Sequence, residues 1–156
     1  MKSVLISIQP QWCELIASGK KTLEVRKTRP KLEVPFKVYI YCTADTVKHI
    51  VFDEYGDRQI ELVPQRVIGE FICDTFVIDK TFGHDALFNG AACMTEIECA
   101  VYSTYSPIYG WHISDLKIYE NPKELCEFIG IKTLRDGFEV RVLERPPQSW
   151  CYVEEA

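Results

Sequence analysis

Short strand-like runs separated by turn residues dominate this chain, and they constrain its fold more than any other feature. Residues 36–42 alternate, with Phe36, Val38, Ile40 and Cys42 on one face. Residues 66–78 form a longer run, in which Gly69 predicts a bulge or bend. Together with two or three short helices, about six such runs predict an α+β fold, a small mixed β-barrel. The predicted strands are residues 4–8, 22–26, 36–42, 66–78, 111–119 and 149–153.

The first helix has the clearest boundaries. Pro10 suits a first helical turn, where its missing N–H is not needed, and Gly19 suits the position just after the last turn. A second short helix is expected within residues 85–99, and a third from the cap residue Asn121 through Phe128. The apolar face of the first helix consists of Trp12, Leu15 and Ile16.

Length and composition indicate one ordinary globular domain spanning residues 1–156. The chain has 156 residues, of which 47% are hydrophobic, and no apolar run approaches the length of a membrane span. Seven cysteines without a Cys-x-x-Cys pair favour reduced thiols over disulfides or a zinc ribbon. His49, His84 and His112 are far apart, so we expect no metal and no cofactor. We expect a cytoplasmic protein without a membrane partner.

Charge is distributed unevenly along the chain. Residues 1–37 carry eight Lys or Arg against three Glu, whereas the remainder carries ten against twenty acidic residues. A basic N-terminal quarter on an acidic body favours a local anion site over a coat for long duplex DNA.

The segment from Gly19 to Arg26 holds the most chemistry. A helix ends at the glycine, and a strand begins directly after it. The period of two sends Leu23 and Val25 to the core, and places Glu24 beside Arg26 on the other face. Cations fixed next to a carboxylate could hold a phosphate or a polar base edge, although an ordinary surface ion pair has the same spacing.

The order of these elements resembles the ASCH domain family. Gly19-x-Lys21-x-x-Glu24-x-Arg26 after a short helix is similar to the family's Gly-x-Lys-x-x-Glu-x-Arg signature. Residues 67–71 and 111–115 resemble its central and Trp-containing strands. Residues 145–153 resemble the closing strand of stand-alone ASCH proteins from bacteria and their phages.

The resemblance implies a PUA-like barrel that binds RNA or a modified nucleotide in a cleft beside the motif. Residues 79–110 are then a family-specific insertion that could form a lid over the cleft. Trp12 is expected to pack mainly in the core, on the apolar side of its helix. The residues expected at the nucleic-acid site are Lys20, Lys21, Glu24, Arg26, Tyr41, Trp111, His112 and Trp150.

An enzymatic function is an alternative hypothesis. One ASCH branch deacetylates acetylated cytidine with a Lys, a Thr three residues later and a distant Glu. Lys21 matches the Lys, but Glu24 occupies the Thr position. Lys21 and Glu24, or Glu70, could instead activate water. Ribonuclease activity with His112 as proton shuttle is a further possibility of this class.

Three functions therefore remain at the level of sequence. A binding module for RNA or a modified nucleotide comes first, because the hydroxyl of the deacetylases is absent. A hydrolase acting on an acylated cytidine-type nucleoside or on RNA is the alternative. The third is a protein-interaction module whose basic patch meets an acidic partner.

Overall fold

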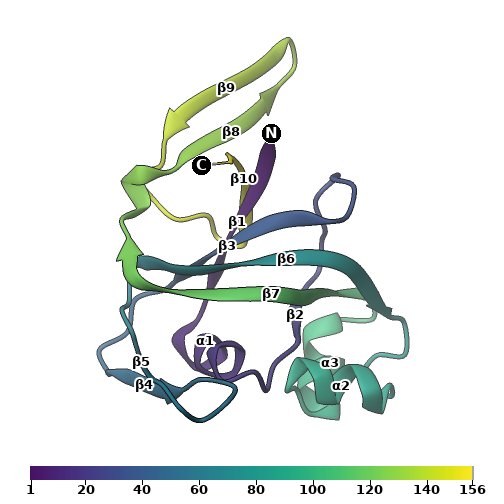
Figure 1. Cartoon of the computed structure of the whole chain (residues 1–156). Helices are drawn as coiled ribbons and strands as arrows, with labels where there is room; N and C mark the ends of the chain where they lie inside the picture. Colours follow the sequence, from purple (N-terminus) through teal and green to yellow (C-terminus); the bar gives the residue numbers. More distant parts are fainter. Residues whose placement is uncertain (156) are drawn as a thin grey trace.

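A mixed sheet of eight strands forms the body of the molecule, with three α-helices beside it (Figure 1). This computed structural model describes residues 1–155. The helices are α1 (Pro10–Ala17), α2 (Ala86–Ala92) and α3 (Glu96–Ser103), with a short 3-10 helix η1 (Leu125–Glu127). The strands are β1 (Lys2–Ile8), β2 (Leu23–Arg26), β3 (Phe36–Cys42), β4 (His49–Phe52), β5 (Gln59–Leu62), β6 (Arg66–Asp79), β7 (Ile108–Lys123), β8 (Ile129–Leu134), β9 (Gly137–Val142) and β10 (Trp150–Glu154).

The large sheet has the order β2-β7-β6-β3-β1-β10-β8-β9, so β2 and β9 are its two ends. Within the described residues 1–155, β1 and β3 are the one parallel pair of this sheet, and the other neighbours are antiparallel. The pairing of β6 with β7 shifts register between Val67 and Gly69, which confirms the irregularity predicted at that glycine. The predicted α+β class, the first helix and a helix within residues 85–99 are likewise confirmed.

The main core lies between α1 and the inner face of the sheet. It contains apolar side chains of β1, β3 and β6, with Ile6, Val38 and Phe71 fully buried. A second cluster covers the opposite face of β3, where Tyr39 and Tyr41 pack with Phe128. Strand β3 is therefore buried on both faces, and its alternating pattern does not separate core from solvent.

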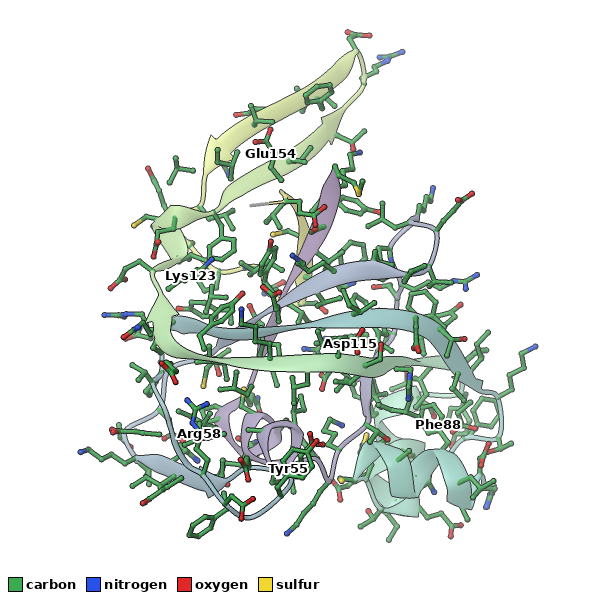
Figure 2. All side chains as sticks on the ribbon, viewed as in Figure 1. Tyr55, Arg58, Phe88, Asp115, Lys123 and Glu154 are labelled. Carbon is green, nitrogen blue, oxygen red and sulfur yellow. The ribbon has the colours of Figure 1, made fainter. Side chains whose placement is uncertain are left out.

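Two helices between β6 and β7 cover the first end of the sheet. Phe88 of α2, labelled in Figure 2, packs in a third cluster with Leu23 and Val25 of β2. The side chain of Thr95 accepts a hydrogen bond from the N–H of Glu98 and so caps α3. This packing leaves both faces of β2 covered.

The third predicted helix, from Asn121 through Phe128, was wrong. Strand β7 continues to Lys123, opposite Val67 of β6, and only the single turn η1 follows. Cross-strand pairing with β6 overrides the cap signal of Asn121-Pro122. The hairpins β4–β5 and β8–β9 were not predicted, and their strands are short.

Within residues 1–155, no helix is long and apolar enough to cross a membrane. No group of three or more His, Cys, Asp or Glu side chains in that range could hold a metal ion.

Removal of the Phe71 ring tests the position of the core. We expect Phe71→Ala to lower the free energy of unfolding by about 3–5 kcal/mol, because a large cavity remains in the main core. Tyr55→Ala is the control: Tyr55 is 77% exposed, and we expect a change within about 0.5 kcal/mol. Urea unfolding followed by circular dichroism measures both, and equal effects would contradict this assignment of the core.

Candidate functional site

The motif residues Lys21, Glu24 and Arg26 lie together, from just after α1 to the end of β2. Gly19 adopts a φ of +79°, a left-handed conformation that glycine accepts without strain and that turns the chain out of α1. The backbone N–H of Lys21 donates to the carbonyl of Leu15, which fixes the start of the next segment. Strand β2 then pairs with β7, with Glu24 opposite Trp111.

One buried carboxylate lies between two cations. Glu24 and Lys21 are only 2% and 3% exposed. The distance from Arg26 Nη1 to Glu24 Oε1 is 2.5 Å, and that from Lys21 Nζ to Glu24 Oε2 is 3.9 Å. Because 3.9 Å exceeds hydrogen-bonding distance, Lys21 attracts Glu24 without bonding it directly.

The guanidinium of Arg26 is largely committed to the protein itself. Its Nη1 donates to Glu24, and its Nη2 donates to the carbonyl of Ser7 in β1 at 2.5 Å. This side chain thus ties the terminal strand β2 to β1. The prediction that Glu24 and Arg26 are neighbours is confirmed, but Glu24 lies on a buried face and not on a surface.

The Lys21 ammonium is buried between the end of α2 and the Trp12 ring. Its Nζ donates to the carbonyl of Ala92 at the end of α2, at 2.6 Å, and lies 4.8 Å from the centre of the Trp12 ring. Burial lowers the pKa of the Lys21 ammonium, and the nearby Glu24 carboxylate opposes that shift. A lysine with a lowered pKa is more readily neutral, and neutral amines are bases and nucleophiles.

A small cavity opens on this cluster. Its volume is about 110 Å³, and two of its walls, Met94 and Tyr102, come from the helical insertion. Two buried polar atoms beside it have no hydrogen-bond partner, Glu24 Oε2 and Arg26 Nε. Such atoms are rare in folded proteins, and a polar ligand group would satisfy them. The full lining is Trp12, Lys21, Glu24, Val25, Arg26, Met94 and Tyr102.

Exposed cations follow the motif in the chain. Lys27 lies over the Tyr102 ring, 5.2 Å from its centre, and so stands beside the cavity wall. Arg29 lies over the rings of Phe76 and Tyr109, at 5.4 and 5.5 Å. Lys31 is also exposed. The name basic rim is used below for these three exposed residues, of which Lys27 lies beside the cavity wall.

The predicted tryptophans lie near this rim but not in the cavity. Trp111 is fully buried, and its indole N–H donates to the carbonyl of Thr28 at 3.4 Å. Trp150 is half-buried and donates to the hydroxyl of Thr28 at 3.0 Å. The two rings meet edge to face, with centres 5.9 Å apart. They brace the loop that carries the basic rim, and Trp111 has no face open for stacking on a base.

Other predicted site residues are dispersed. Tyr41 packs in the second core cluster, with Leu5 and Val67. The Nδ1 of His112 lies 2.6 Å from Asp74 Oδ1, outside the cavity. Lys20 is exposed next to Lys21. The structure therefore gathers Lys21, Glu24 and Arg26, with Lys20 adjacent, and does not bring Tyr41 or His112 to them.

Sequence reasoning missed the walls that α2 and α3 supply. Met94, Tyr102 and the Ala92 carbonyl are about 70 residues or more from the motif, and no local pattern connects them to it. Trp12, assigned mainly to the core, packs against the core but also lines the cavity.

A larger hollow lies at the other end of the sheet. Its volume is about 540 Å³, and Trp150, Tyr152 and Arg145 are among its lining residues. It is mostly apolar and holds no buried charged side chain. The small cavity is the better candidate for chemistry, because only there do buried charges with unused bonding capacity converge.

Comparison with known proteins agrees with the fold and the motif. The ASCH domain family model matches residues 6–123. The crystal structure of an ASCH protein from Zymomonas mobilis superimposes with a TM-score of 0.67 at 20% identity, over 98% of this chain and 88% of that chain. A Tyr-to-Phe mutant of the Zymomonas protein gives 0.67 at 20% identity, over 99% and 92%. No curated protein sequence matches.

These matches show that the α+β fold of this chain is shared with the Zymomonas structures. The chain belongs to the ASCH domain family, because the family model covers most of it, motif included.

Glu24→Gln tests the electrostatics of the cluster. Loss of the carboxylate leaves the buried Lys21 and the half-buried Arg26 without a counter-charge, so we expect the free energy of unfolding to fall by about 3 kcal/mol. The pKa of Lys21 should fall further, since the Glu24 carboxylate opposes the lowering that burial causes. Because the folded-state pKa is below the unfolded one, the contribution of Lys21 to stability increases as pH rises from the former to the latter.

Denaturation and an NMR titration of the lysine side chains measure these effects. Glu61→Gln is the matched control, since the Glu61–Lys48 pair is exposed and worth about 0–1 kcal/mol. An unchanged Lys21 titration in Glu24→Gln would contradict the proposed coupling.

Proposed function

We propose that this ASCH domain binds single-stranded RNA or a modified nucleotide, with the edge of one base directed into the cavity at Lys21 and Glu24. The observation that carries the proposal is that Glu24 Oε2 accepts no hydrogen bond, although Lys21 Nζ attracts it from 3.9 Å. A buried carboxylate oxygen without a donor is costly unless a ligand supplies one. Bases of single-stranded RNA are free to supply such groups, because they are unstacked and splayed outward.

The polarity of the cavity favours a base with an amino group. The Glu24 carboxylate can only accept hydrogen bonds, so it suits an exocyclic amine such as N4 of cytosine. The Lys21 ammonium can only donate, so it suits a carbonyl or ring nitrogen on the same edge. The Trp12 ring forms one apolar wall.

The volume of the cavity limits which ligand groups can enter it. Sites for whole small molecules measure about 300–1,000 Å³, and this cavity measures about 110 Å³. The space suits the edge of one base, with the sugar and phosphate remaining outside. Full entry of a base requires Met94 and Tyr102 to move outward, and with them the α2–α3 segment.

The basic rim supports a path for the phosphates. Lys27, Arg29 and Lys31 are exposed and follow Arg26 in the chain, and Lys20 precedes the motif. Arg26 itself is not assigned to phosphate, since both of its Nη atoms already bond the protein. Its role in the proposal is to position Glu24.

Removal of the rim charges tests the binding model. We expect Lys27→Ala/Arg29→Ala to weaken binding of a fluorescent cytidine-rich oligonucleotide. The slope of log K against log[salt] should fall by about 1.4, since each lost phosphate contact contributes about 0.7 for single strands. Lys48→Ala, an exposed lysine on β4–β5, is the control and should leave the slope unchanged.

The same titrations test the cavity. Glu24→Gln should reduce the preference of the protein for cytidine over uridine oligonucleotides without changing the salt slope. If the wild type and Glu24→Gln prefer cytidine over uridine equally, Glu24 takes no part in base recognition. If the wild type binds no RNA even at low salt, the nucleic-acid model fails and a protein-interaction module replaces it.

A hydrolase is the second candidate, and one observation favours it. Burial lowers the pKa of Lys21, and a carboxylate lies 3.9 Å from its Nζ. This pair has the chemistry of a base and an acid, so it could activate water against an acylated cytidine-type nucleoside or against RNA. No hydroxyl lines the cavity except that of Tyr102, within residues 1–155.

Product analysis separates binding from turnover. Acylated cytidines and total RNA are incubated with the protein, and the products are measured by mass spectrometry. For the hydrolase, we expect turnover that Lys21→Met abolishes and that Lys48→Ala, an exposed lysine on the β4–β5 hairpin, retains. Saturable binding without product would exclude the hydrolase and leave the binding model.

A further inference from the structure

The last strand of the sheet has a free hydrogen-bonding edge. Strand β9 pairs with β8 on one side and has no neighbour on the other, within residues 1–155. All six of its residues are exposed, and the β8–β9 hairpin projects away from the body (Figure 1). Every second residue of a strand points its N–H and C=O toward the same side, so half of the β9 backbone faces solvent.

Two of the devices that protect an edge strand, a proline and a bulge, are missing here. Strand β9 contains no proline, and its register with β8 is continuous, without a bulge. Phe138, Val140 and Val142 lie on one face and are 70%, 46% and 50% exposed. Ile129, opposite Val142 on β8, adds to that apolar face and is 38% exposed. A free edge of this kind is a template for pairing with another strand.

The hairpin is weakly attached to the rest of the sheet. Its register with β10 consists of two residue pairs, Ile131 with Tyr152 and Gly130 with Val153. Two-stranded ribbons without further strands are marginally stable in water. Added strands would stabilise this one, and the sequence of β9 indicates which strand fits.

The sequence of β9 is complementary to itself. If two copies of Gly137–Val142 run antiparallel about a two-fold axis at Val140, Glu139 of each copy faces Arg141 of the other. Phe138 then faces Val142 of the other copy, and the two Val140 residues face each other. Opposite charges and apolar pairs directly across a ladder both stabilise it.

The neighbouring registers are disfavoured by the same residues. An axis moved to Glu139 sets the two Glu139 side chains against each other, and an axis at Arg141 does so with the two arginines. Like charges directly opposite destabilise a ladder. Of these three registers, the one centred on Val140 is the one in which opposite charges face each other.

We propose that the protein forms a two-fold homodimer in which the β9 strands pair antiparallel about Val140. The two hairpins then make one continuous four-stranded ribbon, β8-β9-β9-β8. The partner is a second copy of this chain because the complementarity is between β9 and itself. The proposal is independent of the RNA-binding function, since the motif lies at the opposite end of the sheet.

Charge reversal gives a test that separates assembly from folding. We expect the wild type to be a dimer by size-exclusion chromatography with light scattering. Glu139→Arg places arginines opposite Arg141 twice, and Arg141→Glu places glutamates opposite Glu139 twice. Each variant alone should be a monomer at concentrations where the wild type is a dimer. Mixed in equal amounts, they should form a heterodimer, because both cross-strand pairs then have opposite charges.

Matched controls exclude a general effect of charge. Lys48→Glu and Glu61→Arg make equivalent changes on the β4–β5 hairpin and should leave the dimer intact. Circular dichroism should give the same folded spectrum for all variants. A monomeric wild type, a dimer that survives both reversals, or a mixture that stays monomeric would each overturn the proposal.

Discussion

The bridge from Arg26 holds this end of the molecule together. Strand β2 has four residues and one ladder partner, so backbone pairing alone attaches it weakly. Arg26 connects its Glu24 to the Ser7 carbonyl of β1. That link buries a carboxylate, and the buried carboxylate in turn stabilises the charge of Lys21. Lys21 then bonds the end of α2, so the helical insertion is attached to the sheet through the same charged cluster.

Such a cluster is an inefficient way to stabilise a fold. Removing charges from water costs about as much as their mutual attraction returns, and well-packed apolar residues of similar size often do as well or better. Glu24 Oε2 and Arg26 Nε also remain without partners. A site that keeps buried, incompletely bonded charges beside a cavity has the features of a binding or catalytic centre, which is the basis of the proposed function.

The two ends of the sheet serve different purposes in these proposals. The β2 end is closed over by α2 and α3, and its polar groups face inward to a small cavity. The β9 end is open, and its polar groups face outward along a free edge. Assembly through β9 would therefore leave the cavity and the basic rim of both copies accessible. A bound RNA could then contact two sites per dimer, with a gain in avidity.

The sequence by itself determined the order of elements at the N-terminus, the α+β class, the ASCH signature and the pairing of Glu24 with Arg26. These follow from local rules, the period of two in a strand and the helix end at Gly19. It also placed Leu23 and Val25 together on an apolar face. The tertiary structure alone decided that Glu24 is buried, that Met94 and Tyr102 wall the cavity, and that Tyr41 and His112 lie elsewhere. Burial of a polar residue depends on what packs over it, and here the covering helices come from a segment some 70 residues away.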